Sequence, residues 1–208
     1  VNREKPRVGF VVTAGHEGVF LRFLGGVLQG LNPDLFDVVV VCSSIGEKRI
    51  QKHLSKAGLQ TLVIPNRFDQ MIDTIRDAAF DVLYYWEVGS DVNNYFLPFF
   101  RLAPVQCTSG GVPVTSGTPC LDYFLSSDIV EGENADTHYS ETLVRAKSLL
   151  TCQSRLTLPT APKTREQFGF TNDQHIYLCP HKIEKFHPDL DALFRGILQN
   201  DPQGRIVI

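Results

Sequence analysis

The sequence predicts an α/β fold with a doubly wound parallel sheet, and three observations lead to this fold class. Short apolar segments rich in β-branched residues alternate with amphipathic segments of helical length. The apolar segments are continuous rather than alternating, which is typical of parallel strands covered on both faces. Crossovers between parallel strands are right-handed, so repeated strand–helix units place helices on both faces of the sheet.

The first strand–helix unit runs from an apolar strand at 7–13, through a glycine-containing turn at 14–18, into a helical stretch that ends at Leu31. The next units are predicted as a strand at 37–42, a helix at 46–57, a strand at 60–64, a helix at 67–79 and a strand at 81–86. Continuous apolar strands separated by helices predict that these strands share one parallel sheet.

Aromatic residues dominate 91–102, which is possibly helical, and a short strand follows at 103–106. The segment 108–119 is dense in Gly, Pro, Ser and Thr and is therefore predicted to be a loop, before another strand at 121–126. Loops at strand ends are where α/β folds place their ligands, so this loop is a candidate binding element.

We divide the chain into an N-terminal Rossmann-like domain at 1–156, a linker at 157–172 and the beginning of a second Rossmann-like domain at 173–208. The linker begins with a segment rich in Pro and Thr. The second domain is predicted to contain a strand at 175–179, a helix at 188–200 and a strand that starts at 205. A parallel strand at the last residue leaves its sheet unfinished, so we expect a truncated domain or a sheet completed by another chain.

Composition narrows the classes of function. The 208 residues carry a net charge of −3, which lacks the basic footprint of a nucleic-acid-binding protein. The sequence has neither a membrane-spanning apolar segment nor an apolar leader, so we expect a cytoplasmic protein without a membrane partner. The five cysteines are scattered and indicate neither a disulfide framework nor a zinc site. Cys42 and Cys179 lie in apolar segments and are expected to be buried free thiols.

Six sequence motifs occur in an order and with a spacing similar to those of a known protein family. They are NPDLFDV at 32–38, LAPVQ at 102–106, PVTSG at 113–117, DYFLSSD at 122–128, HYSETLV at 138–144 and KFHP at 185–188. With these motifs the chain resembles, over 7–208, the catalytic region of the O-GlcNAc transferase family. The resemblance is closer to SPINDLY-type and bacterial tetratricopeptide-associated members than to the animal enzyme.

The resemblance implies a GT-B architecture, in which two Rossmann-like domains face each other and the C-terminal one holds most of a UDP-sugar. It implies an inverting glycosyltransferase that moves GlcNAc or another hexose to a protein Ser/Thr or another hydroxyl. No metal or other cofactor is expected, because basic side chains and helix N-termini neutralise the diphosphate in this family. The chain by itself is expected to be inactive, with further uridine-binding elements beyond Ile208.

Lys185 is the first candidate site residue. It lies between the predicted strand at 175–179 and the predicted helix at 188–200, where strand ends and helix N-termini converge on anions. Lys185 matches the family's lysine that contacts the UDP diphosphate and supports the departing charge. His181 and Lys182 are candidates for further nucleotide contacts, and His187 is predicted to belong to the helix cap.

His16 is the second candidate, because it follows the first strand near the position of a family histidine that lies close to the sugar and acceptor. An imidazole there either accepts a proton or hydrogen-bonds the acceptor, unless it only caps the following helix. Glu87 and Asp91 follow the strand at 81–86 and are weaker candidates for acidity at the same edge of the sheet.

The third candidate element is an acceptor and sugar loop that matches a family segment of Gly, Pro, Thr, Ser and Gly. Its residues are Gly111, Pro113, Thr115, Ser116 and Gly117, and their alternative role is turn formation. Family members commonly have an aromatic residue at the position of Ser109 and a Tyr or His at that of Val112. These departures indicate either a different acceptor or a non-catalytic relative that acts as a binding or scaffold module.

A Rossmann dehydrogenase is a third possible class of function, and the sequence fits it poorly. The first turn lacks the GxGxxG spacing, and the second strand ends in Cys42 and Ser43 rather than in an acid for the ribose. The sequence leaves open the sugar, the acceptor, any upstream repeats and the oligomeric state.

Overall fold

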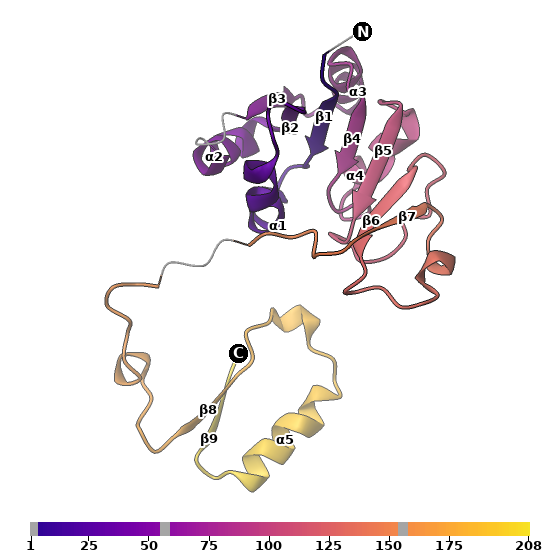
Figure 1. Ribbon diagram of the computed structural model, residues 1–208. Helices are drawn as coiled ribbons and strands as arrows, with labels where there is room; N and C mark the ends of the chain where they lie inside the picture. Colours follow the sequence, from indigo (N-terminus) through magenta and orange to yellow (C-terminus); the bar gives the residue numbers. More distant parts are fainter. Residues whose placement is uncertain (1–3, 55–58, 154–157) are drawn as a thin grey trace. The chain divides into compact units, whose positions relative to one another are not determined.

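The computed structural model describes residues 4–54, 59–153 and 158–208 (Figure 1). The chain divides into two compact units, Val1–Arg155 and Leu156–Ile208, and each has a sheet of its own.

A seven-stranded parallel sheet forms the centre of the first unit, in the order β3-β2-β1-β4-β5-β6-β7. Its strands are β1 (Arg7–Val11), β2 (Asp37–Ser43), β3 (Gln60–Ile64), β4 (Val82–Tyr85), β5 (Val105–Ser109), β6 (Tyr123–Ser127) and β7 (Thr142–Ala146). The strand order grows outward in one direction from β1 to β3 and then in the other from β4 to β7. The chain therefore reverses between β1 and β4, which are hydrogen-bonded neighbours.

Helices cover both faces of this sheet (Figure 1). One face packs against α1 (Glu17–Gly30) and α2 (Ser44–Leu54), whose apolar side chains join Val40, Tyr84 and Trp86 in one core cluster. The other face packs against α3 (Phe68–Asp77) and the short helices α4 (Val92–Phe96) and η2 (Leu97–Phe100).

Sequence and burial agree in these elements. The residues Val38–Cys42 of β2 are all buried, because the strand has helices on both sides. On α3, Met71, Ile72 and Ile75 face the core and the charged residues lie on the opposite side. The predicted α/β fold with a doubly wound parallel sheet is confirmed.

Two strands differ from the predictions. The strand β7 was not predicted, because Val144 is exposed and Arg145 interrupts the apolar pattern at this edge of the sheet. The strand β5 extends through Thr108 and Ser109, which were assigned to the loop. Both hydroxyls are buried and hydrogen-bonded, to the Tyr85 carbonyl and the Tyr84 hydroxyl, so these polar residues fit inside a strand.

Two of the predicted helices have different bounds in the structure. The helix predicted at 46–57 starts earlier, at Ser44, and its predicted residues 55–57 lie outside the described residues. The helix predicted at 67–79 is shorter, Phe68–Asp77. The segment at 91–102, predicted as possibly helical, is confirmed, because it contains α4 and η2.

The second unit contains one parallel β-α-β element. Its strands are β8 (His175–Leu178) and β9 (Gly204–Val207), connected through α5 (Leu190–Asn200). The short helices η4 (Glu166–Phe168) and η5 (Ile183–Lys185) lie before β8 and before α5. Of the two cysteines expected to be buried, Cys42 is fully buried, whereas Cys179 is only half-buried just after β8, because little packs on this small sheet. Within the described residues, no helix is long and apolar enough to cross a membrane.

Candidate active site

Two polar segments meet where β1 and β4 end. In parallel sheets, ligands bind outside the carboxyl ends of the strands at the point where the strand order reverses, which here lies between β1 and β4. After β1, a turn through Gly15, with φ of +91°, leads to His16 at the N-cap of α1. After β4, the chain turns at Glu87 and Gly89, both with positive φ, and enters α4.

His16 is held by an acid from the neighbouring strand end. Its Nδ1 atom lies 2.6 Å from Oε2 of Glu87, and both side chains are largely buried, at 26% and 12% exposure. An ionised carboxylate only accepts hydrogen bonds, so this contact places the hydrogen of a neutral imidazole on Nδ1. The Nε2 atom is then left with a lone pair, which is the arrangement of a general base.

Asp91 lies on the other side of the imidazole, with Oδ2 at 3.6 Å from Nε2. This carboxylate also accepts hydrogen bonds from the hydroxyl of Thr13 and from the backbone N–H of Asn94, the latter at 3.0 Å as the N-cap of α4. Asp91 thus links the end of β1 to the start of α4 and adds negative charge beside His16.

Backbone strain accompanies this arrangement at Glu87, whose φ of +55° lies in the left-handed region that non-glycine residues rarely adopt. The fully buried Asn94 holds this turn, because its Nδ2 donates to the carbonyls of Trp86 and, at 3.2 Å, Glu87. Sequence reasoning did not identify Asn94, and an Asn three residues after a capping Asp gave no distinguishing signal.

Glu17 is a buried acid, at 5% exposure, that sequence reasoning did not identify. Its Oε2 accepts from the Gly15 N–H at 3.0 Å and its Oε1 accepts from the Ser43 hydroxyl at 3.2 Å. A side chain at Gly46 would collide with Glu17, since a Cβ there would lie 2.3 Å from Oε1. Glu17 therefore fixes the turn that presents His16.

The predicted acceptor and sugar loop reaches the same site through Gly111. A Cβ on Gly111 would lie 2.7 Å from Cγ of Glu87, so only glycine allows the loop to approach the acid this closely. Pro113 is exposed, and Gly117 has φ of +66° in a left-handed turn.

Thr115 and Ser116 are engaged within the protein. Both hydroxyls donate to the buried Glu141, that of Thr115 at 2.7 Å, and the Ser116 N–H donates to it at 2.9 Å. Burial favours the neutral acid, but these hydrogen bonds outweigh it and lower the pKa of Glu141. This geometry matches the alternative, turn-forming role of Thr115 and Ser116.

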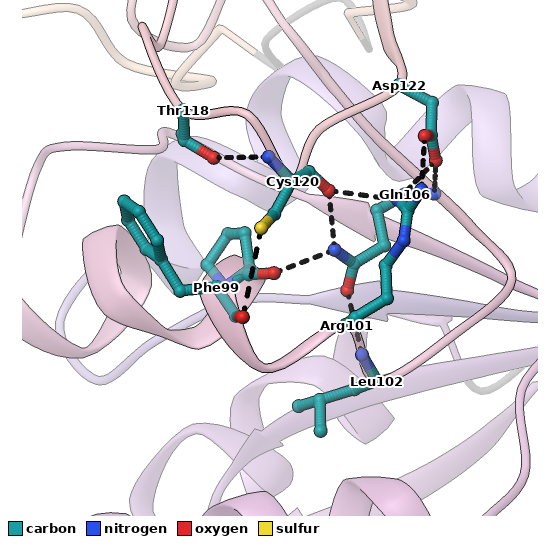
Figure 2. Close-up of polar contacts among 8 residues, drawn as sticks. Phe99, Arg101, Leu102, Gln106, Thr118, Cys120 and Asp122 are labelled. Carbon is teal, nitrogen blue, oxygen red and sulfur yellow. Dashed lines mark hydrogen bonds and ion pairs between the residues drawn. The ribbon is translucent and has the colours of Figure 1, made fainter.

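The far end of the loop is fixed by a polar network around Gln106 (Figure 2). The fully buried Gln106 side chain donates to the Cys120 carbonyl at 2.7 Å and accepts from the Leu102 N–H at 3.1 Å. Asp122 accepts from the Gln106 N–H at 2.8 Å and pairs with both terminal nitrogens of Arg101 at 2.7 Å. The Arg101 hydrogen bonds hold the pKa of Asp122 below its ordinary value. These bonds anchor the return of the chain from the loop into β6.

The three candidates in the second unit lie between β8 and α5, as predicted. Lys182 precedes η5, Lys185 is its last residue, and both side chains and His181 are exposed. His187 accepts a hydrogen bond from the Asp189 N–H at 3.3 Å, near the start of α5, where a cap-region residue was expected.

In the part of the chain that the structure describes, no group of three or more His, Cys, Asp and Glu side chains is arranged to hold a metal ion.

Comparison with known proteins identifies relatives at low identity. No protein-family model matches the chain. The chain is 24% identical over 159 residues to a Solanum lycopersicum protein and 22% identical over 174 residues to one from Petunia hybrida, each named as probable UDP-N-acetylglucosamine–peptide N-acetylglucosaminyltransferase SPINDLY. These matches cover 76% and 84% of the chain, but the chain spans only 17% and 18% of the two relatives.

Among solved structures, a variant of the Thermobaculum terrenum O-GlcNAc transferase matches 97% of the chain with a TM-score of 0.74 at 20% sequence identity. The chain resembles O-GlcNAc transferases in sequence and in fold. The chain spans 38% of that solved structure. The predicted Rossmann-like α/β fold of the GT-B type is confirmed. The curated relatives are glycosyltransferases by name, which supports sugar transfer as the general activity of the family.

Proposed function

We propose that this chain is part of a glycosyltransferase that moves a sugar from a UDP-sugar to a hydroxyl acceptor. The observation that carries the proposal is the His16–Glu87 pair, which lies where β1 and β4 meet and leaves Nε2 of His16 as a base. The resemblance to proteins named as N-acetylglucosaminyltransferases supports GlcNAc or another hexose as the sugar, and a protein Ser/Thr or another hydroxyl as the acceptor.

In the proposed reaction, the acceptor oxygen attacks the anomeric carbon from the face opposite to the UDP, which inverts the configuration. The bond from that carbon to the UDP oxygen breaks, and the acceptor proton passes to Nε2 of His16. Glu87, hydrogen-bonded to Nδ1 at 2.6 Å, stabilises the imidazolium that forms. General-base catalysis of this kind contributes about 10²- to 10⁴-fold in rate.

The departing UDP carries negative charge, and we assign its neutralisation to Lys185, with His181 and Lys182 as additional contacts. The exposed Lys185 ammonium lies on the short helix between β8 and α5 and has no partner among the described residues. A charge-assisted hydrogen bond is worth about 1.5–3 kcal/mol. The proposed transfer needs no metal ion, because these cationic side chains neutralise the negative charge of the departing UDP.

The test is calorimetric titration of UDP into the longest natural version of the protein, compared with its Lys185→Ala variant. We expect the affinity to fall at least about tenfold in Lys185→Ala, which corresponds to about 1.4 kcal/mol. The matched control is Lys48→Ala, an exposed lysine on α2, which should bind UDP as before. Titration in EDTA should give the same affinity if no metal participates.

Two results would contradict the proposal. If the intact protein binds no UDP, the chain belongs instead to a binding or scaffold module that keeps the fold without transfer, as the departures at Ser109 and Val112 suggested. If Lys185→Ala and Lys48→Ala bind UDP equally well, the diphosphate is held elsewhere.

A further inference from the structure

A cavity of about 420 Å³ opens at the carboxyl ends of β4, β5 and β6 in the first unit. Its walls are mainly apolar and include Phe23 and Leu24 of α1, Trp86 after β4, and Phe124 and Leu125 of β6. Trp86 and Phe124 are almost completely buried, at 3% and 1% exposure, so the walls are part of the packed core. Cavities of this size hold small organic molecules.

The segment 149–151, which follows β7, forms part of the wall, and Leu149 in it is exposed. It is tied to α1 because the Cys152 N–H donates to the Phe23 carbonyl at 2.9 Å. Cys152 lies so close to α1 that the helix requires glycine at position 26, since a Cβ on Gly26 would lie 2.6 Å from Cys152 Sγ. The cavity wall is therefore held by a defined backbone contact.

The cavity is adjacent to the candidate active site on two sides. Trp86 in its wall precedes Glu87, which holds His16. Gly110 at its edge precedes Gly111, which lies against Glu87. His16 and Glu87 are not among the lining residues, so the acid–imidazole pair lies just beyond the wall that Trp86 and Gly110 form.

The charges of the residues that line the cavity argue against an anionic ligand. Among the described residues that line the cavity, Glu131 is the one carboxylate, and none is a lysine, arginine or histidine. Oε1 of Glu131 accepts hydrogen bonds from Ser126 at 2.5 Å and from Tyr139 at 2.8 Å. Burial, followed by these interactions with Glu131, raises the pKa of Tyr139 to about 12, so its hydroxyl stays protonated. A phosphate or other anion would meet negative charge and apolar walls here.

We infer that this cavity binds the apolar body of a neutral, hydroxyl-bearing small molecule, such as an aromatic alcohol, and presents its hydroxyl to His16. The inference rests on the proposed function, since it names the acceptor class of the same site. It assigns the acceptor to the first unit and leaves the nucleotide to the cations around Lys185. Aromatic walls favour a flat, apolar acceptor through burial and ring stacking.

The chain contains one tryptophan, Trp86, and its fluorescence therefore reports on the cavity directly. The experiment titrates this 208-residue chain with 2-naphthol, a neutral aromatic alcohol, and with 2-naphthalenesulfonate, an anion with the same rings. We expect saturable quenching by 2-naphthol and at least about tenfold weaker binding of the sulfonate.

Three variants locate the binding. Gly110→Phe places a ring at the edge of the cavity, where a Cβ meets no atom within 4 Å, and Leu149→Glu adds a charge at its exposed outer wall. Each should weaken 2-naphthol binding at least about tenfold. The control Gly30→Phe makes the same substitution at the end of α1, also in open space, and should bind as the unsubstituted chain does. Circular dichroism checks that all three fold.

The inference is overturned if 2-naphthol gives no saturable quenching, if quenching survives both Gly110→Phe and Leu149→Glu, or if the sulfonate binds equally well. Because the readout requires neither UDP nor turnover, the two proposals fail separately. A protein that binds 2-naphthol as expected but no UDP would contradict the transferase proposal alone.

Discussion

The Nδ1 atom of His16 lies 2.6 Å from the Oε2 atom of Glu87, although 71 residues separate the two in sequence. The contact exists because β1 and β4 are adjacent strands, and each residue follows the carboxyl end of its strand. Gly111 and Asn94 then hold Glu87 from two sides, through a close backbone approach and through hydrogen bonds to its turn.

The first prediction concerns Glu87→Gln in the longest natural version of the protein. The amide keeps the size of the side chain but no longer stabilises a positively charged imidazole. We expect kcat for sugar transfer to fall by about 10²-fold or more, with a smaller change in KM. Steady-state kinetics with a UDP-sugar measure both constants.

The double variant His16→Ala/Glu87→Gln separates this role from a general loss of structure. If Glu87 acts through His16, the double variant should be no slower than His16→Ala alone. Additive losses would show that Glu87 acts independently of the imidazole. The exposed acid variant Glu133→Gln serves as the control and should leave kcat unchanged.

The second prediction compares two neighbouring glycines. In Gly111→Ala the new methyl group would lie 2.7 Å from Glu87 Cγ and 3.0 Å from its backbone nitrogen, so the loop or the strained turn must move. We expect the free energy of unfolding to fall by about 1–3 kcal/mol, as for other overpacked positions. In Gly110→Ala the methyl group meets no atom within 4 Å and should change stability little. Urea denaturation measures both, and equal effects would contradict the close approach.

The third prediction concerns the pH dependence of stability and follows from Glu141. Its pKa in the folded protein lies below the ordinary value of 4.5, so the ionised form stabilises the fold at neutral pH. This contribution is lost as the pH falls from about 4.5 through the lower folded pKa. The free energy of unfolding of Glu141→Gln should be about 1–3 kcal/mol lower than that of the unsubstituted protein at pH 7. This difference should shrink as the pH falls.

Urea unfolding at several pH values tests this expectation, with the exposed Glu133→Gln as the matched control. A difference between Glu141→Gln and the unsubstituted protein that stays constant from neutral pH to acid would show that ionisation of Glu141 contributes nothing.

The fourth prediction concerns thiol reactivity. Burial, followed by the nearby acids Glu47 and Glu17, raises the pKa of Cys42 to about 12, and burial also raises that of Cys107 to about 12. At pH 8 about one thiol in 10⁴ would then be ionised, and the thiolate is the reactive form. Cys42 and Cys107 should react with Ellman's reagent only after unfolding, whereas the exposed Cys152 should react in the folded protein. Rapid native reaction that persists in Cys152→Ser/Cys120→Ser/Cys179→Ser would contradict this.

The sequence allowed the sheet and its helices to be predicted, because continuous apolar strands and amphipathic helices are local patterns. It did not allow β7 to be predicted, since an edge strand with exposed Val144 and an internal Arg145 lacks the apolar run of a central strand. The order of the strands follows from long-range pairing, which leaves little trace in any single segment.

The candidate site was partly predictable for the same reason. His16, Glu87 and Asp91 were each identified from their places after strands, but their mutual contact depends on β1 pairing with β4. Thr115 and Ser116 were candidates for contacts to sugar or peptide, with turn formation as their alternative role, and the structure shows their hydroxyls bound to Glu141. The role of Lys185 stays a prediction.

The strand order also determines when the site can form during synthesis of the chain. When only β1, β2 and β3 have left the ribosome, up to Ile64, the chain already contains His16 but lacks Glu87, which follows β4. The imidazole then has no carboxylate to orient it, and β1 has an unoccupied edge. Docking of β4 onto that edge places Glu87 beside His16, so a nascent chain acquires the acid–imidazole pair only with its fourth strand, while β5, β6 and β7 are still to be added to the sheet.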